Sequence, residues 1–333
     1  MANENNNLLE VQNLKTWFAV KKGLLKRTVG HIKAVNDISF AIRPGQTLGL
    51  VGESGCGKTT AARTIARLIP ATTGKVSFDR LDVLSAGGKD LKKIRKEISI
   101  IFQDPFGSLN PRMTVADIVG EPLKVHKNIS GSELIERVAG LLQKVGLSAD
   151  HLNRYPHEFS GGQRQRIGIA RALALNPRLI ICDEPVSALD VSIQSQILNL
   201  LKDLQDEFGF TYLFIAHDLA VVEFFCDTIA VMYMGKIVEQ ASADEFYHNP
   251  VHPYTKALMS AIPQVDPALR KKLTPFTGEV PSLLNPPKGC PFHPRCRDAC
   301  EQCKLDLPQL QPLEHQSDHL VACWKCKKNV KVQ

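Results

Sequence analysis

The chain lacks a long apolar run, and aromatic side chains make up only 6% of its 333 residues. Its best candidate for a membrane span, residues 228–234, is far shorter than the roughly 18 apolar residues that a transmembrane helix needs. The N-terminal sequence MANENNNLLE also lacks the basic start and the apolar core of a signal peptide. These absences predict a soluble, cytoplasmic protein.

The sequence also lacks a nucleic-acid recognition motif. Its formal net charge is +7, but Lys and Arg are scattered along the chain and do not cluster with aromatic residues. We expect a solvated basic surface and no nucleic-acid partner.

Strand and helix patterns alternate along most of the chain. Strands and turns are expected over 8–55, and helices over 59–69, about 115–150 and 161–176. RLIICDEP and FTYLFIAHD are expected to be buried strands, and the segment between them predicts an amphipathic helix that ends at Gly209. This order predicts an α/β fold with a mainly parallel sheet.

The composition changes after about residue 263. Residues 265–333 hold nine of the twenty prolines and six of the nine cysteines, with little periodicity. We expect a small, loop-rich C-terminal module that is held together by something other than a large core.

The segment GESGCGKTT, residues 52–60, has the spacing of a phosphate-binding loop. Its glycines allow backbone N–H groups to surround phosphate oxygens at the start of the following helix. Lys58 is then expected to reach the β- and γ-phosphates of a nucleotide, and the Thr59 hydroxyl to ligate Mg²⁺.

Two acidic residues follow the apolar strand in LIICDEP. Asp183 is placed to hold Mg²⁺ through water, and Glu184 to polarise the water that attacks the γ-phosphate. Adjacent acids after a strand can also cap the next helix, but the phosphate loop favours the catalytic interpretation.

FSGGQRQR, residues 159–166, contains a second helix start suited to phosphate. Ser160 offers a hydroxyl, and Gly161 and Gly162 leave backbone amides exposed. One nucleotide rarely needs two such sites in one chain, so this helix start is expected to face a nucleotide held by another subunit.

Taken in order, these motifs resemble those of an ATP-binding cassette (ABC) ATPase. IIFQDP is similar to the glutamine loop of this family, SALD to its dimer-contact loop, and FIAHD to its switch-histidine segment. Phe18 is similar in position to the aromatic residue that stacks on adenine, with Trp17 as a rival. The resemblance implies a P-loop NTPase fold with a RecA-like core, an antiparallel β subdomain and a helical subdomain over about 105–175. It places this domain at residues 1–263 and the Cys-rich module at 264–333.

The resemblance also implies a set of site residues. The catalytic residues would be Glu184 and His217, and Mg²⁺ would be held by Thr59, Gln103 and Asp183. The nucleotide-binding residues would be Phe18, Gly52, Ser54, Gly55, Cys56, Gly57, Lys58, Thr59, Thr60, Gln103, Ser160, Gly161, Gly162, Gln163, Asp183 and Asp190.

Segments outside the shared motifs, including YHNPVHPYTKALMSA and GEVPSLLNPPKGC, resemble the ATP-binding subunits of oligopeptide and dipeptide importers, and especially the second such subunit of an oligopeptide permease. This resemblance implies a peripheral protein on the cytoplasmic face of the membrane. Its partners would be a second ATPase subunit, two transmembrane permease subunits and an extracytoplasmic peptide-binding protein. The segment DPFGSLNPRMTVADIV is implied to receive a coupling helix of a permease subunit. Nickel or glutathione import, or a soluble cassette protein outside transport, are the alternatives.

Six cysteines near the end of the chain have the spacing of a thiolate site. The C-x₂-C pairs at 300/303 and 323/326 fit zinc, whereas four thiolates also suit a [4Fe–4S] cluster. Importer ATPases carry a similar pattern that some members use for an iron–sulfur cluster, which implies Cys290, Cys296, Cys303 and Cys323 as ligands. Cys300 and Cys326 depart from that pattern, so zinc and a site without metal both stay open. A reducing cytoplasm disfavours disulfides.

Overall fold

The computed structural model describes residues 6–23, 26–261, 278–279, 281–314 and 316–326. These residues form two compact units that interleave along the chain. The first unit contains 6–10, Ala41–Thr47 and Ser77–Ile215, and the second contains the described parts of Val11–Phe40, Leu48–Val76 and 216–326.

A parallel three-stranded arrangement forms the core of the first unit. Its strands are β6 (Ile98–Ile101), β7 (Leu179–Asp183) and β8 (Thr211–Ala216), and β7 lies between the other two. Every residue of β7 is buried, as its continuous apolar run predicts. Helix α6 (Val191–Phe208) is anchored to β8, because the Tyr212 hydroxyl donates a hydrogen bond to the Leu201 carbonyl at 3.0 Å.

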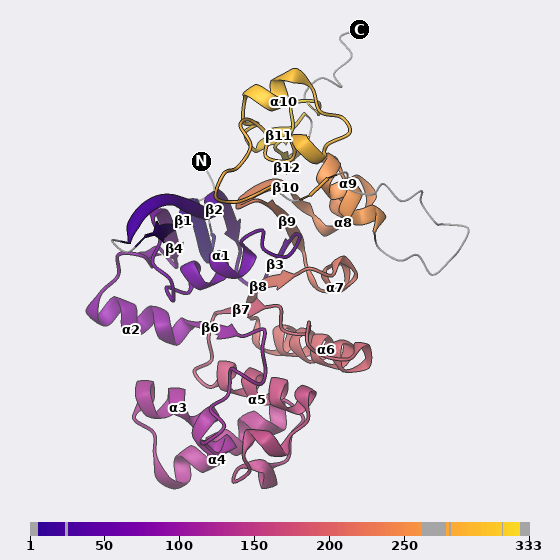
Figure 1. Ribbon diagram of the computed structural model, residues 1–333. Helices are drawn as coiled ribbons and strands as arrows, with labels where there is room; N and C mark the ends of the chain where they lie inside the picture. The colour runs from indigo at the N-terminus through magenta and orange to yellow at the C-terminus, as the bar shows by residue number, and fades with distance from the viewer. Residues whose placement is uncertain (1–5, 24–25, 262–277, 280, 315, 327–333) are drawn as a thin grey trace. The chain divides into compact units, whose positions relative to one another are not determined.

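Helices α3, α4 and α5 pack together in the first unit (Figure 1). Their bounds and those of the neighbouring helices are α2 (Gly88–Glu97), α3 (Val115–Lys127), α4 (Gly131–Lys144), η1 (Ala149–His151), η2 (Pro156–Glu158) and α5 (Gly161–Leu173). The apolar faces of α3 and α4 are buried, and Thr114 caps α3 by accepting a hydrogen bond from the Asp117 amide. These helices confirm the helix-rich stretch that the sequence predicts over about 115–150.

The second unit contains a mixed sheet. Strand β3 (Thr47–Val51) runs parallel to β9 (Thr228–Tyr233), which pairs antiparallel with β10 (Lys236–Ser242). The sheet continues through β12 (Gln316–Val321) to β11 (Gln311–Leu313). The helices of this unit are α1 (Lys58–Ile65), α7 (Leu219–Phe225), α8 (Ala243–His248), α9 (Pro253–Ser260), η4 (His293–Arg295) and α10 (Glu301–Leu305).

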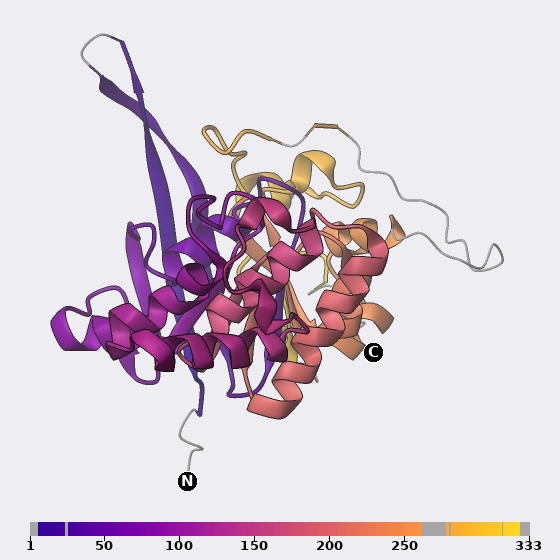
Figure 2. The ribbon, with the colours of Figure 1, turned by 90° about the horizontal axis from the view of Figure 1, so that it is seen from below.

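A second sheet contains two unusually long strands. Strands β1 (Leu9–Lys22) and β2 (Arg27–Ile42) form the extended ribbon seen in Figure 2, and β4 (Thr73–Phe78) lies on the other side of β1. Residues Ser77 and Phe78 at the end of β4 pair with the short strand β5 (Leu81–Asp82). The predicted strands over 8–55 are thus confirmed.

Three details differ from the sequence-based expectations. Helix α1 ends at Ile65, because Arg67 adopts the left-handed conformation (φ 56°) and the Leu68 amide bonds back to the Arg63 carbonyl. Helix α5 similarly ends at Leu173, before Asn176 at φ 53°. The C-terminal segment is less loop-like than expected, because β11 and β12 extend the sheet of β10.

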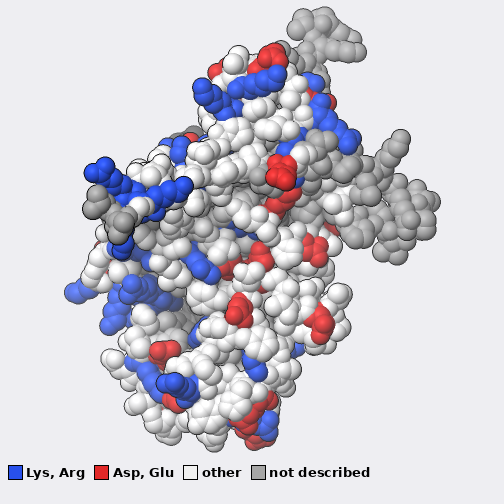
Figure 3. Space-filling view, viewed as in Figure 1, with Lys and Arg blue, Asp and Glu red and all other residues white. Residues whose placement is uncertain are grey.

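Strand β9 covers most of residues 228–234, the best candidate for a membrane span in the sequence. In the described part of the chain, no helix is long and apolar enough to cross a membrane. On the face shown in Figure 3, Lys and Arg form several separate groups among acidic and uncharged residues.

Candidate nucleotide-binding site

The phosphate-binding loop of the second unit connects β3 to α1. Gly52, Gly55 and Gly57 have φ angles of 151°, 80° and 111°, which L side chains rarely adopt. A Cβ atom on Gly52 would lie 2.2 Å from the Met232 carbonyl oxygen, and one on Gly57 would lie 2.0 Å from the Ala34 carbonyl oxygen. The loop can therefore adopt this path only with glycine at both positions.

Lys58 lies inside this loop and is only 4% exposed. Its ammonium group donates hydrogen bonds to the Gly52 carbonyl at 2.7 Å and to the Glu53 carbonyl at 3.2 Å. Thr59 and Thr60 follow in the first turn of α1, where backbone amides point toward the loop. Both the amides and the ammonium group are suited to an anionic phosphate.

Cys56 and Ser54 also belong to this loop. The Cys56 side chain is buried, and burial raises the pKa of its thiol, although the charge of Lys58 acts in the opposite direction. Cys56 is therefore a packed neutral thiol in the loop, as expected of a small buried cysteine.

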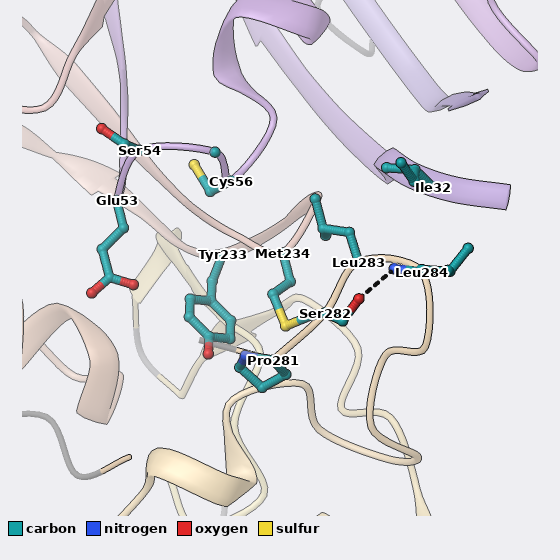
Figure 4. A pocket seen from close by; sticks show the side chains of 11 residues that line it. Ile32, Glu53, Ser54, Cys56, Tyr233, Met234, Pro281, Ser282, Leu283 and Leu284 are labelled. Carbon is teal, nitrogen blue, oxygen red and sulfur yellow. Dashed lines mark hydrogen bonds between the residues drawn. The ribbon is translucent and has the colours of Figure 1, made fainter. Parts of the chain in front are cut away.

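An apolar cavity of about 350 Å³ adjoins the loop within the second unit (Figure 4). Residues 53–56 form one side, and Tyr233, Met234 and the segment 281–284 form much of the remainder. Leu284 lies close to β2, because a Cβ atom on Gly30 would be 3.0 Å from its Cδ1 atom. The C-terminal segment thus contributes to the surroundings of the phosphate loop.

The two aromatic candidates on β1 lie in different environments. Lys33 places its ammonium group 4.9 Å from the centre of the Trp17 ring, and the His31 ring lies 6.3 Å away. Phe18 is 41% exposed. An exposed ring is accessible to a base, and the choice of Phe18 over Trp17 stays a prediction.

His217 comes directly after β8 and is exposed. The next residue, Asp218, caps α7 by accepting a hydrogen bond from the Ala220 amide at 2.9 Å. This cap fixes the backbone beside His217 and leaves the imidazole at the end of a buried strand.

In the first unit, the structure brings Gln103 and Glu184 together. The Gln103 side-chain amide donates a hydrogen bond to a Glu184 carboxylate oxygen at 2.8 Å. Asp183 is fully buried at the end of β7. Glu184 has a positive φ of 49°, and its amide donates to the Ile215 carbonyl at 3.1 Å. A positive φ is unusual for a residue other than glycine, and such backbone strain is common at functional sites.

The helix start at Ser160 is built as a capping box. The Ser160 hydroxyl accepts a hydrogen bond from the Gln163 amide, and the Gln163 side-chain oxygen accepts one from the Ser160 amide at 3.1 Å. A Cβ atom on Gly162 would lie 2.6 Å from Ile193 Cγ2. Gln163 was predicted to bind nucleotide, and the structure shows that its side chain also caps the start of α5. Asp190 lies at the exposed start of α6.

The predicted cysteine ligands share one neighbourhood in the second unit. Burial raises the pKa of the Cys290 thiol to about 12, with further contributions from Cys303, Cys323 and Cys296. The hydrogen bond from Cys326 lowers the pKa of Cys323 to about 6. Thiolates are ligands that zinc and iron–sulfur clusters prefer, so the residue types match such an occupant.

The metal itself is not confirmed. All nine cysteines are free thiols. Within the described ranges, no group of three or more His, Cys, Asp or Glu side chains has an arrangement that could hold a metal ion. The Cys300 and Cys303 sulfur atoms lie 3.4 Å apart and interact with each other. The predicted [4Fe–4S] cluster and its zinc alternative therefore remain predictions.

Sequence reasoning missed the contacts that hold the phosphate loop from outside. Glu53 forms a two-bond ion pair with Arg295, and its amide donates a hydrogen bond to the Tyr254 hydroxyl at 2.9 Å. Neither partner belongs to a recognised nucleotide motif. Arg295 lies between two of the clustered cysteines, and Tyr254 lies in YHNPVHPYTKALMSA, but neither sequence pattern indicated a contact with the phosphate loop.

Comparisons with known proteins identify the family of this chain. Residues 35–187 match the family described as ABC transporter, and residues 238–303 match the family described as Oligopeptide/dipeptide transporter, C-terminal region. The chain is 50% identical to the oligopeptide transport ATP-binding protein AppF of Bacillus subtilis, over 95% of this chain and 96% of that protein. It is 51% identical to the oligopeptide transport ATP-binding protein OppF of Salmonella typhimurium, over 96% of each chain.

A solved structure gives the same result for the fold. The ATP-binding cassette MJ0796, in a dimeric post-hydrolysis state bound to ADP and Pi, matches with a TM-score of 0.63 and 31% sequence identity. The match covers 71% of this chain and 98% of that one. It confirms the predicted α/β fold of an ABC nucleotide-binding domain.

Proposed function

The chain belongs to the ABC transporter family, in the group of oligopeptide and dipeptide transport ATP-binding proteins, and we propose that it hydrolyses ATP to drive peptide import. One observation carries this proposal. The identity of about half of all residues extends over nearly the whole chain and includes the C-terminal region, which lies outside the general ATPase motifs.

In this activity, residues of the second unit bind the nucleotide. Lys58 and the amides of the phosphate loop bind the β- and γ-phosphates, and Phe18 stacks on the base. Thr59 supplies a hydroxyl ligand for Mg²⁺, which neutralises phosphate charge when it is bound. His217 donates to the γ-phosphate.

The residues of the first unit act on water and on Mg²⁺. Asp183 and Gln103 contribute to holding the ion, and Glu184 accepts a proton from the attacking water. The buried end of β7 supports these roles, because a low dielectric strengthens the interaction of each carboxylate with positive charge.

The helix start at Ser160 serves a second cassette. Ser160, Gly161, Gly162 and Asp190 contact the nucleotide or the phosphate loop of a partner ATPase subunit when two cassettes close head to tail. The exposed position of Ser160 supports this role. Closure driven by ATP then moves two membrane-spanning permease subunits, which receive peptide from an extracytoplasmic binding protein.

The C-terminal thiols form a thiolate site. Cys290, Cys296, Cys303 and Cys323 hold a [4Fe–4S] cluster, with zinc as the alternative occupant. Their proximity supports this assignment, because the charges of Cys303, Cys323 and Cys296 all act on the Cys290 thiol. The cluster or ion stabilises a C-terminal module over residues 264–333, which follows the nucleotide-binding domain of residues 1–263. Residues 262–277 at this boundary lie outside the described part.

The protein works at the cytoplasmic face of the membrane. A panel of substrates tests the choice of cargo in a transporter reconstituted with its permease and binding subunits. Uptake of labelled oligopeptides, without competing uptake of nickel or glutathione, is the expected result. ATPase activity stimulated by DNA in the absence of membrane partners would instead indicate a cassette protein outside transport.

A further inference from the structure

The phosphate loop is held by a charged residue from the cysteine-containing segment. Arg295 lies between Cys290 and Cys296, and its guanidinium donates hydrogen bonds to both carboxylate oxygens of Glu53. The two distances are 2.7 and 3.1 Å, and the residues are 242 positions apart in the sequence. A two-bond arginine–carboxylate pair fixes orientation as well as distance.

This ion pair is largely removed from water. The Arg295 side chain is only 5% exposed and that of Glu53 is 25% exposed. The guanidinium also lies 5.9 Å from the centre of the Tyr233 ring. Removing one partner from such a pair leaves a poorly solvated charge, which is more costly than removing both partners.

The backbone of Glu53 is hydrogen-bonded to Tyr254 and to Lys58. Its amide donates to the Tyr254 hydroxyl at 2.9 Å, and its carbonyl accepts a hydrogen bond from Lys58 at 3.2 Å. A displacement of Glu53 therefore changes the position of the lysine that contacts phosphate. Figure 4 shows Glu53 at one end of the loop segment that also carries Ser54 and Cys56.

The segment that carries Arg295 is itself firmly packed. Phe292 is 2% exposed, and its ring lies 5.3 Å from that of Tyr233 and 5.4 Å from that of Tyr254. The Cys290 amide donates to the Cys303 carbonyl at 2.8 Å. The packing of Phe292 and the hydrogen bond of Cys290 therefore hold the segment that carries Arg295 in place.

We propose that Arg295 is a positioning residue for ATP, which acts by holding Glu53 so that Lys58 and the loop amides keep the geometry that a triphosphate needs. This inference rests on the proposed ATPase function. It also assigns to the cysteine-containing segment a direct effect on the nucleotide site, through one side chain.

Equilibrium binding of MgATP to the purified full chain tests this role. We expect Arg295→Met to weaken ATP binding by about tenfold, because it leaves the Glu53 carboxylate unpaired beside the phosphate loop. Arg295→Lys is expected to lose less, since an ammonium group retains the charge but not the two-bond geometry. The matched control is Arg297→Met, which removes an exposed arginine from the same segment and should leave binding unchanged.

A double-variant cycle separates positioning from loss of structure. Adding Glu53→Gln to Arg295→Met is expected to recover part of the lost affinity, because no unpaired charge remains. A general folding defect would instead add to the loss and lower the melting temperature of both variants. The inference is overturned if Arg295→Met binds MgATP within twofold of the unaltered chain, or if the double variant shows no recovery. Should the unaltered chain fail to bind MgATP, the proposed function itself would be wrong.

Discussion

Gln103 donates a hydrogen bond to Glu184 at 2.8 Å, although the two residues are 81 positions apart in the sequence. Gln103 follows β6 and Glu184 follows β7, and these neighbouring parallel strands end at the same edge of the sheet. The glutamine loop is therefore linked to the proposed general base within one unit. A movement of that loop would change the environment of the residue that activates water.

Glu184→Gln is expected to reduce steady-state phosphate release by at least about 100-fold, because an amide cannot accept the proton from water. ATP-dependent association with the partner ATPase subunit should persist, since the substitution preserves size and hydrogen-bonding capacity. Phosphate release and size-exclusion chromatography with ATP measure the two effects. The exposed Glu136→Gln on α4 serves as the control. Retained hydrolysis in Glu184→Gln would show that this residue is not the base.

Two glycines in the phosphate loop should respond differently to alanine. Gly57→Ala places a Cβ atom 2.0 Å from the Ala34 carbonyl oxygen, so the loop must move and MgATP binding should be lost. A Cβ atom on Gly55 meets no atom within 4 Å, so Gly55→Ala should cost only about 1–2 kcal/mol for its left-handed backbone. Melting temperature and nucleotide binding distinguish the two variants. Equal behaviour would contradict the described loop path.

Stability should fall as the pH drops from about 6.5 to about 4. Burial lowers the pKa of His252 to about 4, whereas its usual value is near 6.5. Between these values the unfolded chain binds a proton that the folded chain does not, so the free energy of unfolding decreases by up to about 3 kcal/mol. Glu239 acts in the same direction at lower pH. Burial raises its pKa, but hydrogen bonds from His319 and the amides of Val251 and His252 outweigh that effect.

His252→Asn provides the matched control for this pH dependence. The ring nitrogen of His252 accepts a hydrogen bond from the Tyr254 amide, and asparagine can retain this helix cap. Denaturant unfolding at several pH values should show a shallower loss of stability in the variant. If both proteins lose stability in parallel between pH 6.5 and 4, His252 is not responsible.

Cys323→Ser should abolish metal binding by the C-terminal segment, whereas Cys300→Ser should retain it. Cys323 belongs to the proposed set of four thiol ligands, and Cys300 does not. Iron, sulfide and zinc analysis of anaerobically purified protein, together with visible absorption, measures the occupant. A colourless protein with stoichiometric zinc would show that the site holds zinc and not an iron–sulfur cluster. Loss of metal in Cys300→Ser would change the ligand set.

Local motifs made much of the site predictable from the sequence. Close contacts with the backbone of neighbouring strands require glycine at positions 52 and 57, so the spacing of these glycines predicts the path of the loop. The buried strand β7 was predictable because an apolar run ends at two acids. The S-x-x-Q spacing of Ser160 and Gln163 could also have revealed the capping box, which accounts for the structural role of Gln163.

Other features depend on contacts that no local pattern encodes. Arg295 and Glu53 are 242 positions apart, and the segment of Arg295 is packed by long-range contacts such as that of Phe292 with Tyr233. Strands β11 and β12 are short and interrupted by polar residues, so their periodicity is weak. The early end of α1 depends on a left-handed residue, Arg67, whose side chain does not predict that conformation.

Peptide uptake driven by ATP tests the central claim most directly. The chain is combined in proteoliposomes with its partner ATPase, permease and binding subunits, and labelled oligopeptide is followed together with phosphate release. We expect uptake that requires hydrolysable ATP and disappears with Glu184→Gln in this chain. Unchanged peptide uptake with that variant, or ATP hydrolysis that is never accompanied by peptide uptake, would contradict the proposal that this protein drives peptide import.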